Sequence, residues 1–512
     1  PQSRLMLVRW LAASWRFDEA EAALGTISSE EVALEGANAV AQAYESAGRL
    51  DEAIPLYEKA LADRARVLGD EHPDTLISRG NLAGAYYAAG RLGEAIPLFE
   101  GVLADHVRIL GDEHPDTLIS RNNVAGAYES AGRLGEAIPL FEEVLADRVR
   151  VLGDEHPDTL TSRNNLAGAY RAAGRLGEAI PLFEGVLADH VRILGDEHPD
   201  TLISRGNLAG AYYAAGRLGE AIPLFEEVLA DRVRVLGEVH PHTLTSRNNL
   251  AGAYRAAGRL GEAIPLFEQV LADRVRALGK DHPDTLASRN NLASAYQAAG
   301  RLGEAIPLFE QVAADSARVL GEVHPHTLTS RNNLAGAYRA AGRLGEAIPL
   351  FEQVLADRVR ALGKDHPDTL ASRNNLASAY QAAGRLGEAI PLFEQVAADS
   401  ARVLGEIHPH TLTSRNNLAG AYYAAGRLGE AIPLFEEVLA DRVRVLGEVH
   451  PDTLASRSNL AGAYESAGRL TEAITLLEEV LADSVRVLGA DHPPHPHLPG
   501  QPRTRLPGGR PS

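Results

Sequence analysis

The residues NLAGAYYAAGRLGEAIPLFE at 207–226 recur with small changes every 42 residues, and this recurrence predicts the fold. The leucine of its Gly-Arg-Leu triplet marks the period, with no insertion or deletion between steps. That leucine lies at Leu50, Leu92, Leu134, Leu176, Leu218, Leu260, Leu302, Leu344, Leu386, Leu428 and Leu470. A fixed period in this range predicts a solenoid, in which each unit packs mainly against its neighbours.

One unit, at residues 200–241, predicts two helices. Its first half places Leu208 and Tyr212 close to one face at helical spacing. Gly216 ends the first helix, where a left-handed residue is favoured, and Gly237 ends the second. Strand patterns are absent. The unit therefore predicts an all-α chain with two antiparallel helices per repeat.

These residues resemble the tetratricopeptide repeat. Its signature is carried here by Leu208, Ala209, Tyr212, Ala221 and Phe225. The long 42-residue unit, with Leu-Gly-x-x-His-Pro-Asp before the first helix and Asn-Asn-Leu-Ala within it, resembles the kinesin light chain subclass, bacterial type. The resemblance implies a right-handed α-solenoid whose first helices line a concave groove for peptides or partner helices.

The period divides the chain into three regions. Residues 1–28 hold a degenerate N-terminal repeat or cap, residues 29–491 hold eleven units, and residues 492–512 form a Pro-rich tail. Such a tail is expected to be disordered. Two consecutive units are also repeated letter for letter, at residues 237–320 and 321–404. Recent duplication explains this identity better than packing does.

Composition excludes several classes of function. The chain has 69 acidic and 50 basic residues, a net charge of −19, which argues against nucleic acid as a partner. It has no cysteine, which excludes disulfides and thiolate metal sites. No N-terminal stretch is long enough to span a membrane or has the pattern of a signal peptide. We expect a cytoplasmic protein with no membrane partner, and a sequence that starts with Pro1 instead of Met is expected to be a fragment.

The sequence contains no recognisable catalytic or metal-binding motif. The repeated histidines fall in His-Pro turns, where a structural role is favoured over metal binding because equivalent turns of a stack lie about 10 Å apart. Paired acids fall on the same turns, and no phosphate loop, nucleophile elbow or zinc-protease helix is present. We predict no catalytic residue, no cofactor and no metal site, and hence no enzyme.

The candidate binding residues lie on the first helix of each unit. An asparagine precedes the signature leucine, and its amide can donate to and accept from a peptide backbone. The alternative is that it bonds the backbone of the neighbouring repeat and serves only stacking. The predicted groove asparagines are Asn123, Asn165, Asn207, Asn249, Asn291, Asn333, Asn375 and Asn417.

The residue after the signature tyrosine varies and is the candidate for selectivity. Arginines at this position can bind carboxylates of a partner, and exposed tyrosines can anchor apolar groups. Surface drift is the alternative explanation. The arginines are Arg171, Arg255 and Arg339, and the tyrosines are Tyr87, Tyr213 and Tyr423.

The sequence therefore predicts a protein–protein interaction scaffold that binds a peptide or protein along its groove. The alternative is a sensor arm of a larger nucleotide-binding switch ATPase whose N-terminal part precedes Pro1. A third is a decaying array with no partner. Partner identity, pathway and oligomeric state stay open.

One hypothesis concerns the gene. A single cytosine gained in a C-rich run that encoded His-Pro-His-Thr-Leu-Thr-Ser-Arg, as at residues 240–247, would convert it to the His-Pro-Pro-His-Pro-His-Leu-Pro of residues 492–499. The tail is then a frameshifted twelfth unit. Reading the gene tests this: the original frame is expected to encode another first helix beyond residue 499, and codons that cannot do so refute the frameshift.

Overall fold

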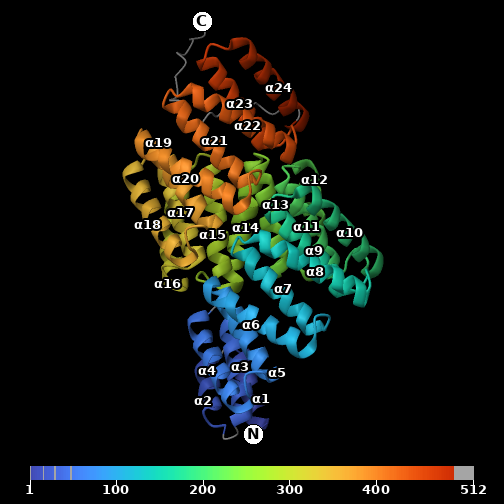
Figure 1. Cartoon of the computed structure of the whole chain (residues 1–512). Helices are drawn as coiled ribbons and strands as arrows, with labels where there is room; N and C mark the ends of the chain where they lie inside the picture. The colour runs from blue at the N-terminus through green and yellow to red at the C-terminus, as the bar shows by residue number, and fades with distance from the viewer. Residues whose placement is uncertain (1, 15, 28–29, 47–48, 489–512) are drawn as a thin grey trace.

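The computed structural model describes residues 2–14, 16–27, 30–46 and 49–488. Within them the chain forms 24 helices and no strand (Figure 1). The helices are α1 Gln2–Ala13, α2 Phe17–Leu24, α3 Glu30–Ser46, α4 Leu50–Leu68, α5 Pro73–Ala88, α6 Leu92–Leu110, α7 Pro115–Ser130, α8 Leu134–Leu152, α9 Pro157–Ala172, α10 Leu176–Leu194, α11 Pro199–Ala214, α12 Leu218–Leu236, α13 Pro241–Ala256, α14 Leu260–Leu278, α15 Pro283–Ala298, α16 Leu302–Leu320, α17 Pro325–Ala340, α18 Leu344–Leu362, α19 Pro367–Ala382, α20 Leu386–Leu404, α21 Pro409–Ala424, α22 Leu428–Leu446, α23 Pro451–Ser466 and α24 Leu470–Leu488.

Each unit contributes two helices, as predicted. We call the odd-numbered helices from α3 to α23 the A helices, and the even-numbered helices from α4 to α24 the B helices. A further pair, α1 and α2, packs against α3 in the region predicted to hold the degenerate repeat. The tail predicted at residues 492–512 lies outside the described residues.

Local signals fix both ends of helix A. In α11, Nδ1 of His198 accepts a hydrogen bond of 3.2 Å from the backbone N–H of Asp200, so this histidine is the N-cap. At the other end Gly216 has a φ of 67°, and the N–H of Arg217 donates to the carbonyl of Tyr212 over 2.9 Å. This is the Schellman end that glycine favours. The repeated histidines thus have the structural role expected of them.

Small residues let the helices of a pair approach closely. Ala209, Ala211 and Ala221 are fully buried, and Phe225 fills the space between units. The apolar clusters cross unit boundaries, because the face of each pair is covered by the next pair. Burial of this kind contributes about 25 cal/mol for each Å² of apolar surface.

Polar bonds repeat at each boundary between units. The hydroxyl of Tyr212 donates to Oε1 of Glu184 on the preceding B helix over 2.6 Å, and the guanidinium of Arg217 lies 4.4 Å from the centre of the Tyr212 ring. Arg232 donates to Oγ of Ser246 on the next A helix over 2.7 Å. These contacts fix the angle between neighbouring pairs.

An arginine occupies a position of helix A that faces the B helix of its own unit. The structure shows how it packs: Arg205 donates to Asp231 on its own B helix over 2.9 Å and to Asp196 in the preceding turn over 3.1 Å. Its side chain is only 11% exposed. The two acids compensate the charge of a buried guanidinium, as such a position requires.

The units coil into a superhelix whose turns contact each other. Consecutive A helices such as α13 and α15 lie closer together than consecutive B helices do, which places the A helices on the concave side. One full turn brings α21 beside α9: Nε2 of His408 lies 3.1 Å from the carbonyl oxygen of Ala172. None of the described helices is long and apolar enough to cross a membrane.

The core predicts a local stability effect. Phe309 is fully buried in α16, so Phe309→Ala is expected to lower the free energy of local opening by about 3–5 kcal/mol through lost burial and a cavity. Hydrogen exchange is expected to accelerate in α15 to α17 and to stay unchanged in α7, because coupling in a solenoid runs between neighbours. Val319→Ala, at a position 37% exposed on the same helix, is the control, and equal acceleration in both variants would contradict the assignment.

A pH dependence follows from the contact between turns. Burial lowers the pKa of the His408 imidazole to about 4 from its ordinary value of 6.5. The unfolded chain therefore binds this proton more readily than the folded chain does. The full stability of the fold is present above about pH 6.5 and declines as the pH falls towards 4, and the loss due to His408 reaches about 2 kcal/mol at pH 5. The stability of the wild type is expected to fall more between pH 7.5 and 5 than that of His408→Gln. If the unfolding free energies of the two proteins change in parallel with pH, the assigned contribution of His408 is refuted.

Candidate partner-binding groove

The concave face of the superhelix carries the predicted binding residues. Between α7, α9 and α11 it holds a cavity of about 280 Å³. The cavity is lined by Asn122, Gly126, Glu129, Phe141, Asn164, Asn165, Gly168, Arg171, Phe183 and Asn207. A methyl group built on Gly168 would meet no atom within 4 Å, so the small residue leaves the floor of the groove open.

Most of the predicted asparagines bond the preceding unit. Nδ2 of Asn165 donates to Oδ1 of Asn122 over 3.0 Å, and Asn207 donates in the same way to Asn164 over 2.9 Å. Asn291, Asn333, Asn375 and Asn417 make the equivalent bond. These asparagines thus do bond the neighbouring unit, but the acceptor is a side-chain amide and not the backbone that the alternative assumed. Each amide keeps a second N–H and a carbonyl oxygen for a ligand.

Two asparagines differ from the rest. Asn123 and Asn249 are exposed and make no side-chain hydrogen bond. The reason lies one unit earlier, where Gly80 and Gly206 replace the asparagine that would accept. Their amides are therefore free on the concave face.

The three predicted arginines have no acidic partner. Among the side chains that the structure describes, Arg171, Arg255 and Arg339 are the only arginines with neither a hydrogen bond nor an ion pair. The guanidinium of Arg171 lies 5.8 Å from the centre of the Phe183 ring. The arginines of the boundaries between units, by contrast, bond acids, serines or carbonyls. Three free cations thus lie along one line of A helices.

Neighbouring protein atoms partly desolvate the guanidinium groups of two of these arginines. Desolvation lowers the pKa of the guanidinium groups of Arg171 and Arg339, which nevertheless stay charged. Glu129, one unit before Arg171, has its pKa raised by the same cause, and the arginine opposes that shift. The two charges line one cavity without an ion pair between them. An anionic group here would meet a cation whose water is partly displaced.

The predicted tyrosines divide into two kinds. The hydroxyl of Tyr87 is 2.6 Å from Oγ of Ser130, and that of Tyr423 is 2.9 Å from Oγ of Ser466, both in the next unit. Tyr213 has no such partner, because Ala256 stands at the equivalent position. All three rings are about two-fifths exposed.

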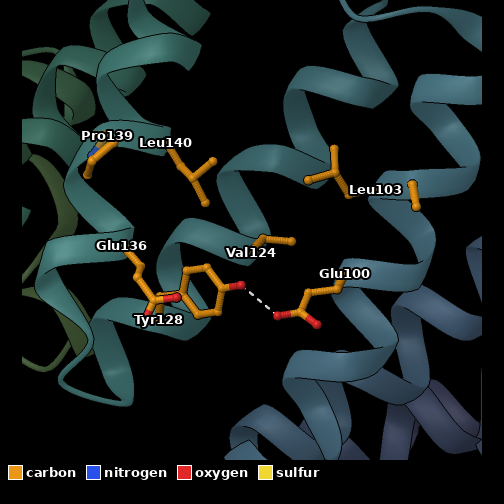
Figure 2. Close-up of a pocket in the computed structure, with 8 residues that line it drawn as sticks. Glu100, Leu103, Val124, Tyr128, Glu136, Pro139 and Leu140 are labelled. Carbon is orange, nitrogen blue, oxygen red and sulfur yellow. Dashed lines mark hydrogen bonds between the residues drawn. The ribbon is translucent and has the colours of Figure 1, made fainter.

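A second cavity, of about 430 Å³, lies between α6, α7 and α8 and is mainly apolar. Figure 2 shows Tyr128 and Glu100 across it, joined by a hydrogen bond of 2.6 Å. This bond raises the pKa of the tyrosine hydroxyl. Here the hydroxyl of Tyr128 and the carboxylate of Glu100 satisfy each other, whereas the Arg171 side chain makes neither a hydrogen bond nor an ion pair with a described residue in the concave cavity. The concave groove is therefore the better candidate.

Sequence reasoning missed two features of the groove. The pairing of the asparagines depends on the residue 43 positions earlier, and the Gly80 and Gly206 substitutions were the signal that could have shown it. Glu129 stands at the variable position after the signature tyrosine, and only the structure shows that it lines the same cavity as Arg171.

Comparison with known proteins gives one family. The tetratricopeptide repeat family matches at residues 33–104, 81–148, 121–189, 158–232, 206–274, 242–315, 284–358, 326–402, 368–442 and 410–484. None of the curated proteins compared with the chain is similar to it.

Many solved structures are similar, and three of them illustrate the range. A kinesin light chain-like protein of Podosopora anserina with nearly identical TPR-like repeats is 44% identical, covering 40% of this chain and 98% of its own, with a TM-score of 0.35. BtubC (BKLC) from P. vanneervenii is 19% identical, covering 48% and 98%, with a TM-score of 0.38. A Rap protein complexed with competence and sporulation factor is 11% identical, covering 73% and 99%, with a TM-score of 0.47.

Proposed function

The chain belongs to the tetratricopeptide repeat family, and on that premise we propose that it is a scaffold that binds an acidic segment of a protein or peptide along the concave groove. Repeats of this family generally act as non-catalytic scaffolds that suit protein–protein interaction. The proposal concerns the ligand and the residues that bind it.

The unpartnered arginines carry the proposal. In a chain with an excess of acids, nearly every described guanidinium has found a partner, and the three that have none share one face. An arginine binds a carboxylate through two parallel hydrogen bonds, which is stronger and more directional than a lysine contact. We therefore expect Arg171, Arg255 and Arg339 to bind three carboxylates of one ligand.

The overall charge limits which ligands can bind. At −19 the protein repels acidic molecules at long range, so a carboxylate gains only when it reaches the groove. Desolvation of Arg171 and Arg339 strengthens the contact once it is made. These opposing effects favour a ligand whose acids are separated along the chain over one with a dense acidic cluster.

The free amides supply contacts that do not depend on the ligand sequence. Asn249 lies on α13, the helix that also carries Arg255, and Asn123 lies on α7, next to the helix that carries Arg171. An exposed primary amide can bond both the N–H and the C=O of an extended peptide. The unpartnered hydroxyl of Tyr213 lies on α11, between two of the arginines.

The spacing of the arginines sets a length for the ligand. They stand two units apart, which is about 20 Å if adjacent helices are about 10 Å apart. An extended chain rises about 3.3 Å per residue, so successive acids are expected about six residues apart.

A peptide experiment tests this proposal. Fluorescent 15-residue peptides carrying two glutamates at separations from two to nine residues are titrated with the full chain, and affinity is expected to be highest near a separation of six. Changing Arg171, Arg255 and Arg339 together to Glu is expected to weaken binding of that peptide at least tenfold, because both glutamates then meet a negative charge whichever pair of positions they reach.

The chain offers a matched control. Arg276, Arg360 and Arg444 have the same spacing, lie exposed on B helices outside the groove, and give the same change of net charge when reversed. Equal loss in both triple variants would show that net charge alone matters. Equal binding of all the peptides would refute the groove assignment.

A further inference from the structure

A contact between consecutive superhelical turns repeats four times at constant register. The His-Pro pairs that begin α17, α19, α21 and α23 each lie against the glycine that follows α5, α7, α9 and α11. Pro325 lies on Gly90, Pro367 on Gly132, Pro409 on Gly174, and Pro451 on Gly216. The hydrogen bonds of the second and third contacts both join residues 236 positions apart. The unbroken period is what keeps this register.

In the second and third contacts, His366 and His408 use both ring nitrogens. Nδ1 of His408 accepts from the N–H of His410 over 3.1 Å, so the neutral ring carries its hydrogen on Nε2. That N–H donates to the carbonyl of Ala172, and in the same way His366 donates to the carbonyl of Ser130 over 3.2 Å. Ala172 and Ser130 are the last residues of α9 and α7, whose carbonyls have no partner within the helix.

The glycines of the contact have a steric reason beyond their backbone angle. A methyl group built on Gly90 would lie 2.6 Å from Cγ of Pro325, and those built on Gly132 and Gly174 would overlap Pro367 and Pro409. Gly300 and Gly342 have the same φ, 70° and 72°, and would meet nothing within 4 Å. Equivalent glycines therefore differ only in whether another turn lies on them.

We propose that these four corners form a latch that holds neighbouring turns together and closes the side of the concave groove. The latch consists of helix ends and turns. Few apolar side chains contribute to it: Leu446 of α22 packs against the apolar cluster of α7 to α12. Because each unit packs on its sequence neighbours independently of the latch, the turns can separate without unfolding any unit. The array is then a spring with a closed and an extended form.

Matched glycine variants test the latch. Gly132→Ala with Gly174→Ala is expected to force the turns apart, while Gly300→Ala with Gly342→Ala carries the same backbone strain and no clash. Small-angle scattering is expected to give a larger radius of gyration and maximum dimension for the first pair only, with equal helix content by circular dichroism. Equal dimensions for the two variants would overturn the latch.

A chemical crosslink gives a second measurement that does not depend on glycine. Because the chain has no cysteine, Ala172→Cys with His410→Cys provides two unique thiols on exposed residues that flank the third contact. A short bis-maleimide is expected to join them within one chain, and at least tenfold more slowly when Gly132→Ala and Gly174→Ala are added. Absence of the intrachain crosslink, or an unchanged rate, would overturn the proposal.

One consequence rests on the proposed function. If the groove binds acidic peptides, the opened variant is expected to associate several-fold faster with the 15-residue peptide than the Gly300→Ala, Gly342→Ala control. Equal association rates would overturn the role in ligand access. Scattering and crosslinking need no ligand, so failure of peptide binding is distinguishable from failure of the latch.

Discussion

The surface that each unit presents to the next is the interaction on which the structure depends. A single helix pair leaves Phe225 and its apolar neighbours uncovered, so it gains its stability only when the next pair packs on it. Buried alanines such as Ala209 set how close the helices come, and the bond from Tyr212 to Glu184 sets the angle. Repeated without insertion, one such angle produces a superhelix, and a superhelix produces both a concave face and contacts between turns.

The concave face acquires its character from what the interface leaves unused. Arg205 and Arg232 bond residues of adjacent helices and units, whereas the side chains of Arg171, Arg255 and Arg339 make neither a hydrogen bond nor an ion pair with any described residue. The groove asparagines likewise fall into two groups: most bond an amide of the preceding unit, and Asn123 and Asn249 make no side-chain hydrogen bond within the described part of the chain. Residues needed for stacking vary little from unit to unit, while the position after the signature tyrosine changes, so the proposed selectivity sits where packing exerts no demand.

Much of the fold could be predicted from sequence because its signals are local. The spacing of Leu208 and Tyr212 predicts helix A, and Gly216 ends it through a φ that only glycine adopts easily. The family signature predicts the pairing of helices. The packing of Arg205 could not be predicted, because its partners Asp231 and Asp196 lie on another helix and a turn. The use of the groove asparagines was equally open, because an amide suits a neighbour or a ligand.

The identical segments 237–320 and 321–404 separate what sequence determines from what tertiary structure decides. Their helices and buried phenylalanines coincide, because these depend on local spacing and on the adjacent units. Yet the amide of Asn249 is free, because Gly206 stands at the acceptor position of the preceding unit. The amide of Asn333 is bonded, because Asn290 stands at the equivalent position. Pro241 is exposed and its copy Pro325 is partly buried, since only Pro325 has an earlier turn beneath it. Local sequence thus fixed the repeating unit, whereas contacts across units and across turns fixed which copies of a residue remain available, because neighbours, and not the residue itself, determine its partners.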